Sequence, residues 1–166
     1  MKKKEILLYM LMIVFSSSVY AQIPEEFKNF PKGSEPEFIG SKLAQHYNSI
    51  KDSDKPILYP ETCFWFGTLK FADATKDDEI FTPLENRFIR MLGENSGAMQ
   101  TKVHVDRNVF GIVPLQLYVQ TGNKTYYDVG IDYADSQWTM PEDVTSGDRI
   151  EYQKLLDQGL SWQTRY

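Results

Sequence analysis

Hydrophobic side chains recur every three or four residues along much of the chain, the spacing that places them on one face of an α-helix. The first such stretch covers residues 34–51. Its apolar positions are Phe38, Ile39, Leu43, Tyr47 and Ile50. We expect an amphipathic helix that buries this face against the rest of the fold. The preceding residues 22–33 contain two prolines and Gly33, which predicts an extended lead-in.

Two longer stretches repeat one arrangement, in which an apolar helix is followed by a short polar turn and a second helix. In the first stretch a helix opens at Trp65-Phe66-Gly67 and stops at residues 75–78, and its partner runs to Gly93. In the second a helix opens at Phe110-Gly111 and stops at residues 121–124, and its partner runs to Trp138. The sequence therefore predicts two αα-hairpins.

The turn residues explain where these helices stop and start. The side chains that can cap the second helix of a hairpin are Asp77, Asp78 and Asn123. Gly122 can adopt the left-handed conformation that ends a helix. Pro114 is tolerated in a first helical turn, so we place the start of its helix near Val113. Gly67 and Gly111 are expected where backbones pack closely or where a loop turns before a helix.

After Trp138 the pattern becomes irregular. Residues 139–147 contain Pro141 and Gly147, and residues 148–157 form a polar segment. Residues 159–166 are rich in aromatic side chains. They are typical of the approach to a third hairpin.

The first 21 residues have the pattern of a signal peptide. Three lysines precede the apolar run Ile6–Phe15, which is too short to span a bilayer as a stable helix. Val19 and Ala21 then form a cleavage site for signal peptidase, so we expect cleavage before Gln22. An uncleaved anchor helix is the alternative. Cleavage predicts a periplasmic or secreted protein with no membrane contact after processing.

Composition indicates one folded domain and excludes several function classes. Hydrophobic residues make up 42% of the 166 residues and charged residues 25%, which is too apolar for a disordered chain. The net charge is -5, and residues 1–21 hold three lysines and one glutamate, so cleavage changes it to -7. Broad binding to nucleic acid is therefore not expected.

Cysteine and histidine are scarce. One cysteine, Cys63, excludes an internal disulfide, and two histidines with one cysteine leave no zinc cluster. We therefore expect neither a metal nor a cofactor. Cys63 lies among Thr62, Phe64 and Trp65, which predicts a buried thiol.

Five segments together resemble the six-hairpin glycosidases of glycoside hydrolase families 88 and 105, the unsaturated glucuronyl and rhamnogalacturonyl hydrolases. The segments are Pro60–Leu69, Val105–Gly111, Pro114–Tyr118, Ile131–Trp138 and Leu160–Arg165. The family fold is all-α, an (α/α)6 toroid of six helical hairpins around a central pocket. The resemblance implies that residues 34–166 form the N-terminal portion of such a toroid, as a partial six-hairpin glycosidase domain.

The resemblance also implies a substrate and a reaction. Family members act on oligosaccharides that carry a 4,5-unsaturated uronic acid. An aspartic acid protonates C4, water adds at C5, and the resulting hemiketal opens to release the sugar. In the family the proton donor follows the segment that Trp162–Arg165 resembles, so we expect it beyond residue 166. The chain is then inactive alone, and the missing C-terminal part of the same domain is a possible partner.

Candidate site residues follow from the resemblance and from residue chemistry. Asp106 matches a second family aspartate that lines the pocket, which makes it the catalytic candidate; the alternative is a helix N-cap. The substrate-binding candidates are His104, Phe64, Trp65, Trp162 and Arg165. Aromatic rings can stack on a sugar and arginine can bind a carboxylate, but the same residues also fit core or surface positions. A non-enzymatic helical-hairpin module that binds sugar or protein is the alternative function.

Overall fold

The computed structural model describes residues 28–50, 56–99, 101–142 and 144–163. The chain divides into two units, residues 1–35 and residues 36–166. All regular secondary structure in the described residues is helical, which confirms the all-α prediction. None of the described helices is long and apolar enough to cross a membrane. The predicted signal peptide lies outside the described residues.

The described part of the first unit is a short turn. The amide and hydroxyl of Ser34 both donate to the carbonyl of Pro31, at 2.9 and 2.7 Å. Gly33 has a φ of +86°, which favours glycine. Residues 28–33 contain no helix, as the predicted lead-in requires, and residues 22–27 lie outside the described part.

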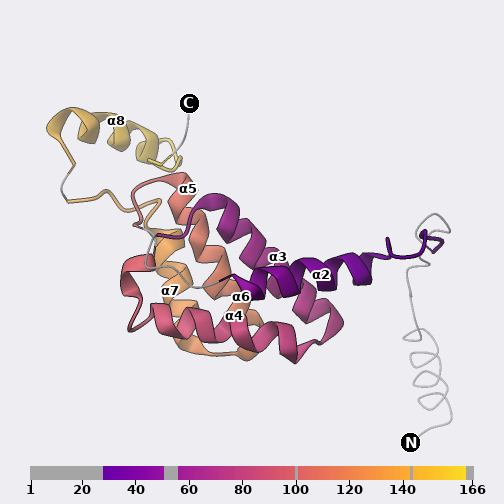
Figure 1. The fold of residues 1–166 in the computed structure, drawn as a ribbon. Coiled ribbons are helices and arrows are strands. Elements are labelled where there is room, and N and C mark those ends of the chain that lie inside the picture. The colour runs from indigo at the N-terminus through magenta and orange to yellow at the C-terminus, as the bar shows by residue number, and fades with distance from the viewer. Residues whose placement is uncertain (1–27, 51–55, 100, 143, 164–166) are drawn as a thin grey trace, which may run out of the picture. The chain divides into compact units, whose positions relative to one another are not determined.

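The second unit contains both predicted hairpins (Figure 1). The first pairs α3 (Tyr59–Thr75) with α4 (Asp78–Met91), and the second pairs α6 (Ile112–Thr121) with α7 (Lys124–Asp135). Asp77 and Asn123 cap α4 and α7: their carboxylate and amide oxygens accept from backbone N–H groups at 3.0–3.1 Å. Gly122 ends α6 with a φ of +71°.

Two details of the first hairpin differ from expectation. Helix α3 begins at Tyr59 and not at Trp65, because Pro60 fits the first helical turn and extends the helix toward its N-terminus. Its end at Lys76 is left-handed with a φ of +55°, although the residue there is not glycine. The backbone N–H of Lys76 accordingly donates to helix carbonyls one turn back.

Aromatic rings join the two hairpins. Helix α3 packs against both α4 and α6. At this junction the buried ring of Trp65 lies 6.5 Å from Phe88 of α4. It lies 6.2 Å from Phe110 of the 3-10 turn η3 (Val109–Gly111), which leads into α6. Edge-to-face contacts of this kind add to the free energy of burial, so this cluster holds α3, α4 and α6 together.

Glycines allow the helices of the second hairpin to approach closely. A Cβ at Gly111 would lie 2.6 Å from the Cβ of Tyr133, and one at Gly130 would lie 2.5 Å from Leu115. The expectation of close packing is confirmed at Gly111. It is wrong at Gly67, where a Cβ would meet no atom within 4 Å.

Helix α2 (Pro36–Ser49) turns a different face to the core than its pattern predicts. Four of the five predicted core positions are 43–50% exposed: Phe38, Ile39, Leu43 and Ile50. Only Tyr47 is buried, together with Ala44. The physical reason is Gly40, whose missing side chain leaves room for the ring of Phe71 on α3. The face that holds Gly40, Ala44 and Tyr47 therefore packs, and the rest of the expected face does not.

The remaining helices were not predicted. The short α5 (Val105–Asn108) and η3 lead directly into α6, and the 3-10 turn η2 (Ser96–Ala98) follows the end of α4. Helix α8 (Ser146–Asp157) is capped by the hydroxyl of Thr145, which accepts from the backbone N–H of Asp148 at 3.3 Å. No residue of α8 is buried.

The prediction of a buried Cys63 is wrong, because its thiol is exposed. The buried positions of α3 are Thr62, Trp65, Thr68, Leu69 and Ala72. This helical spacing of three and four residues excludes the position of Cys63, although its neighbours in sequence are aromatic.

Candidate functional site

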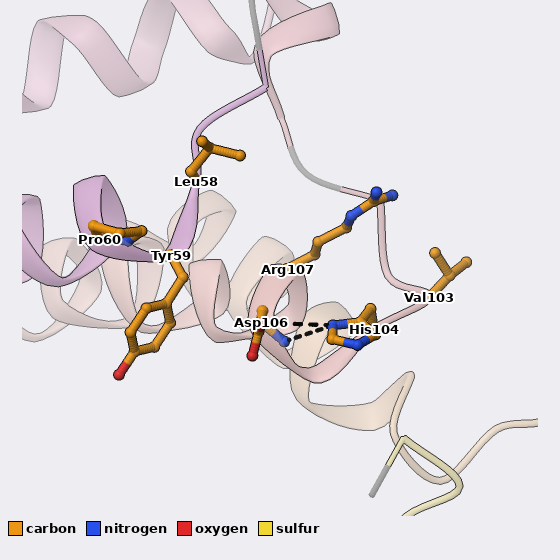
Figure 2. A pocket seen from close by; sticks show the side chains of 7 residues that line it. All are labelled: Leu58, Tyr59, Pro60, Val103, His104, Asp106 and Arg107. Carbon is orange, nitrogen blue, oxygen red and sulfur yellow. Dashed lines mark hydrogen bonds and ion pairs between the residues drawn. The ribbon is translucent and has the colours of Figure 1, made fainter. Parts of the chain in front are cut away.

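An open pocket of about 580 Å³ lies where the start of α3 meets the start of α5 (Figure 2). Leu58, Tyr59 and Pro60 contribute one wall. The other wall is formed by Val103, His104, Asp106 and Arg107. Two predicted site residues, His104 and Asp106, therefore lie in the same pocket. The segments that bring them there are the beginnings of the two apolar helical stretches.

His104 and Asp106 are joined through the backbone. His104 is the N-cap of α5, and its Nδ1 accepts from the backbone N–H of Asp106 at 3.2 Å. The carboxylate of Asp106 lies 3.9 Å from the same ring nitrogen, close enough for an ion pair when the imidazole is protonated. Because Nδ1 accepts, neutral His104 carries its proton on Nε2. The interpretation of Asp106 as an N-cap is thus wrong, since His104 fills that role.

Both side chains are accessible to a ligand. The side chain of His104 is 46% exposed and that of Asp106 is 41% exposed. The pair offers a carboxylate that accepts hydrogen bonds and an imidazole whose second ring nitrogen can make one to a ligand. This combination can hold sugar hydroxyls or orient a water molecule.

Two further pocket residues were not identified from the sequence. The neighbouring side chain of Cys63 raises the pKa of the Tyr59 phenol, with a smaller contribution from the charge of Asp106. The phenol therefore stays protonated and able to donate. Arg107 donates from Nη1 to the hydroxyl of Thr101 at 2.9 Å. Tyr59 directly precedes one of the resembling segments, and Arg107 lies inside another. Their places in the sequence could therefore have indicated both as pocket residues.

The two predicted stacking residues lie elsewhere. Trp65 has no exposed surface: Phe88 and Phe110 surround its ring, and the guanidinium of Arg87 lies 4.8 Å from its centre. A sugar therefore has no face of Trp65 on which to stack in this structure. Phe64 is partly buried, and its ring lies 4.9 Å from that of Tyr47. Neither residue lines the pocket.

The predicted residues near the end of the chain also lie outside the pocket lining. Trp162 is 6% exposed, packs 5.1 Å from the ring of Tyr152 and donates from its indole N–H to the carbonyl of Ser136 at 2.8 Å. It contacts the end of α7. Arg165 lies outside the described residues. Within the described ranges, no three His, Cys, Asp or Glu side chains form a group that could hold a metal ion.

No family model, curated protein or solved structure matches this chain. The resemblance to six-hairpin glycosidases thus stays a prediction. The fold and the pocket geometry are the observations on which a function can be argued.

Proposed function

We propose that residues 34–166 are the first hairpins of an (α/α)6 toroid and belong to a glycoside hydrolase that acts on 4,5-unsaturated uronyl oligosaccharides. The observation that supports this most is the pocket. It joins the starts of two of the resembling segments, Pro60–Leu69 and Val105–Gly111, and contains the matching aspartate, Asp106, beside His104. In a toroid the ends of the inner helices line a central pocket. A pocket between the starts of successive helical segments is therefore expected.

The arrangement of the hairpins supports the same proposal. The first helices of the two hairpins, α3 and α6, pack on each other, as successive inner helices of a toroid must. Helix α6 contains no charged residue, whereas α4 contains five: Asp78, Glu79, Glu85, Arg87 and Arg90. A less polar inner helix and a more charged outer helix are what the toroid predicts.

Each pocket residue has a role in this proposal. Asp106 accepts hydrogen bonds from the substrate or from the water that adds at C5. His104 lies beside it and accepts the proton that this water loses when it adds at C5, and Arg107 binds the uronate carboxylate. The proton for C4 comes from an acid beyond residue 166. Because residues 1–21 have the pattern of a signal peptide, we place the reaction in the periplasm or outside the cell.

Binding of an unsaturated uronyl disaccharide to the full chain tests the proposal. In a nitrogen-15 NMR titration, the amide resonances of His104, Asp106 and Arg107 should shift. Asp106→Asn should weaken binding about ten- to a hundredfold, because a hydrogen bond to a charged group contributes roughly 1.5–3 kcal/mol. The matched control is Asp135→Asn, on the exposed face of α7, which should bind like the unchanged chain. Unmoved pocket resonances at about 10 mM disaccharide would overturn the proposal.

Turnover tests the position of the acid. The full chain alone should leave the ultraviolet absorbance of the unsaturated disaccharide constant, since none of its pocket residues is assigned to protonate C4. Rapid loss of absorbance would show that the proton donor lies within the 166 residues, and would refute its placement beyond them.

The second candidate is a helical-hairpin module that binds protein. It is favoured by the exposed apolar side chains of Ile39 and Leu43 on α2 and of Ile50 directly after it, which a partner surface would cover. A disaccharide titration in which no pocket resonance moves would favour this candidate over the hydrolase.

A further inference from the structure

The segment after α8 returns to the C-terminal end of α7. The backbone N–H of Trp162 donates to the carbonyl of Gln137 at 3.3 Å, and its indole N–H donates to that of Ser136 at 2.8 Å. The hydroxyl of Ser161 also donates to Gln137, at 3.2 Å. Carbonyls at the end of a helix need partners from outside the helix. Residues 161–162 supply them and are thereby fixed in place.

From this fixed segment, the side chain of Gln163 extends to the loop that carries the pocket residues. Its Nε2 donates to the carbonyl of Lys102 at 2.7 Å, and its own backbone N–H donates to the hydroxyl of Ser161 at 3.1 Å. Gln163 is only 6% exposed. A hydrogen bond that is shielded from water in this way is not easily replaced by one to solvent.

Lys102 makes a second connection to α7. Its ammonium forms an ion pair with Asp132 and lies 5.4 Å from the centre of the Tyr133 ring. Burial lowers the pKa of Lys102, and the Asp132 side chain that it pairs with is 62% exposed. An ion pair of this exposed kind contributes little. The carbonyl contact with Gln163 is therefore the stronger restraint on the backbone at residue 102.

The backbone at residue 102 sets the position of the pocket residues that follow. Val103 and His104 line the pocket, and the carbonyl of His104 accepts from the N–H groups of Arg107 and Asn108 at 2.9 and 2.8 Å. A shift of the loop thus moves the cap of α5 together with the carboxylate of Asp106.

We propose that Gln163 is a positioning residue for the pocket, which links the C-terminal segment on α7 to the loop that presents His104 and Asp106. The link itself rests on contacts within the chain; only its importance for sugar binding rests on the proposed function. Gln163 contacts no pocket ligand and acts through Lys102. Its removal should therefore alter the imidazole of His104 as well as the affinity for the disaccharide.

Three variants of the full chain test the link. Gln163→Ala removes the donor and the side chain, and Gln163→Glu keeps the shape but lacks the N–H group. The matched control is Gln158→Ala, at an exposed position after α8. In both Gln163 variants, amide exchange at Asp106 and Asn108 should be about tenfold faster, because about one hydrogen bond is lost. The nitrogen-15 shifts of the His104 ring should change as its cap contact loosens. The control should show neither effect.

The outcomes separate the link from the proposed function. If both Gln163 variants change the His104 signals but the unchanged chain binds no disaccharide, the link stands and the hydrolase proposal fails. If the chain binds disaccharide but both variants keep its affinity, exchange rates and His104 signals, the link is overturned. If Gln163→Ala does not fold, Gln163→Glu decides alone: behaviour like the unchanged chain overturns the link, and faster exchange supports it.

Discussion

Arg87 is the side chain on which three helices converge, and its local sequence gave no sign of this. Its Nη1 donates to the hydroxyl of Tyr47 on α2 at 2.7 Å, and its Nη2 donates to Glu61 on α3 at 2.5 Å. Its guanidinium also lies over the ring of Trp65. A single side chain on α4 thus replaces water for one buried hydroxyl and packs on the central aromatic cluster.

Replacing Arg87 with methionine should lower the free energy of unfolding by about 2 kcal/mol, because the buried hydroxyl of Tyr47 loses the hydrogen bond from the guanidinium and the partly exposed carboxylate of Glu61 loses its ion-pair partner. The packing on Trp65 is largely kept. Urea unfolding followed by circular dichroism measures the change. Arg149→Met, on exposed α8, is the control and should change stability by less than about 0.5 kcal/mol. A loss of under about 1 kcal/mol for Arg87→Met would contradict the role of this side chain.

The buried phenol of Tyr133 makes the free energy of unfolding depend on pH in the alkaline range. Burial raises its pKa to about 12, and burial with a hydrogen bond to Glu85 does the same for Tyr126. In the unfolded chain a tyrosine loses its proton near pH 10. The stabilisation from a raised pKa is therefore complete below about pH 10 and is lost as the pH rises toward about 12.

Tyr133→Phe removes one of these titrations. Between about pH 10 and 12 the unchanged chain should lose about 2 kcal/mol more stability than this variant, allowing for partial solvation of the hydroxyl. Urea unfolding at a series of pH values measures the difference. Tyr127→Phe, at an exposed ring, should follow the unchanged chain. Parallel curves for Tyr133→Phe and the unchanged chain would show that Tyr133 does not lose its proton on unfolding in this range.

At the scale of elements, the two hairpins could be predicted because their signals are local. Asp77, Asn123 and Gly122 each act on backbone groups within a few residues. The orientation of α2 could not be predicted in this way. Its sequence holds two faces that could be buried, and the choice depends on the fit of Gly40 against Phe71, a residue from another helix.

The candidate site residues also differ in whether local sequence or contacts from other helices decide their place. Asp106 was proposed from a resemblance carried by a short motif, and His104 from its place two residues earlier. Both lie in one pocket because they belong to one local turn at the start of α5. Trp65 was assigned to the site because an aromatic residue at helical spacing fits both a core and a binding surface. Whether its ring is exposed is decided by Phe88 and Phe110, which arrive from other helices. Helix α8 was missed because Gly147 in its first turn weakens the helical signal.

Gly111, which is in close contact, and Gly67, which is not, permit a prediction about helix packing. Gly111→Ala should destabilise the chain by about 2 kcal/mol, because its new Cβ would overlap the Cβ of Tyr133 and push η3 away from α7. Gly67→Ala is the matched control. It adds the same methyl group inside α3 where no atom is near, and should stabilise the chain by about 0.5–1 kcal/mol. Thermal or urea unfolding gives both values, and equal effects of the two substitutions would contradict the packing argument.

At the scale of the whole unit 36–163, burial is distributed unevenly. The core cluster runs from Ala44 on α2 to Tyr133 on α7 and includes residues of every helix of the two hairpins. Helix α8 contributes no member to this cluster, and the segment around Trp162 is what ties its far end to α7. Local opening is least costly where few apolar contacts are lost. We therefore expect α8 to open separately from the hairpins.

Native-state hydrogen exchange in increasing urea measures this difference. Amides of α3 and α6 should exchange only through global unfolding, with a strong dependence on urea, whereas those of α8 should exchange faster and almost independently of urea. A pair of truncations gives an independent measure. Leu117→Ala, at a fully buried position of α6, should cost about 3 kcal/mol, and Ile150→Ala, 63% exposed on α8, less than about 0.5 kcal/mol. Equal protection of α8 and α6, with the same urea dependence, would instead mean that α8 unfolds together with the hairpins. It would then require a packing surface that the described residues do not provide.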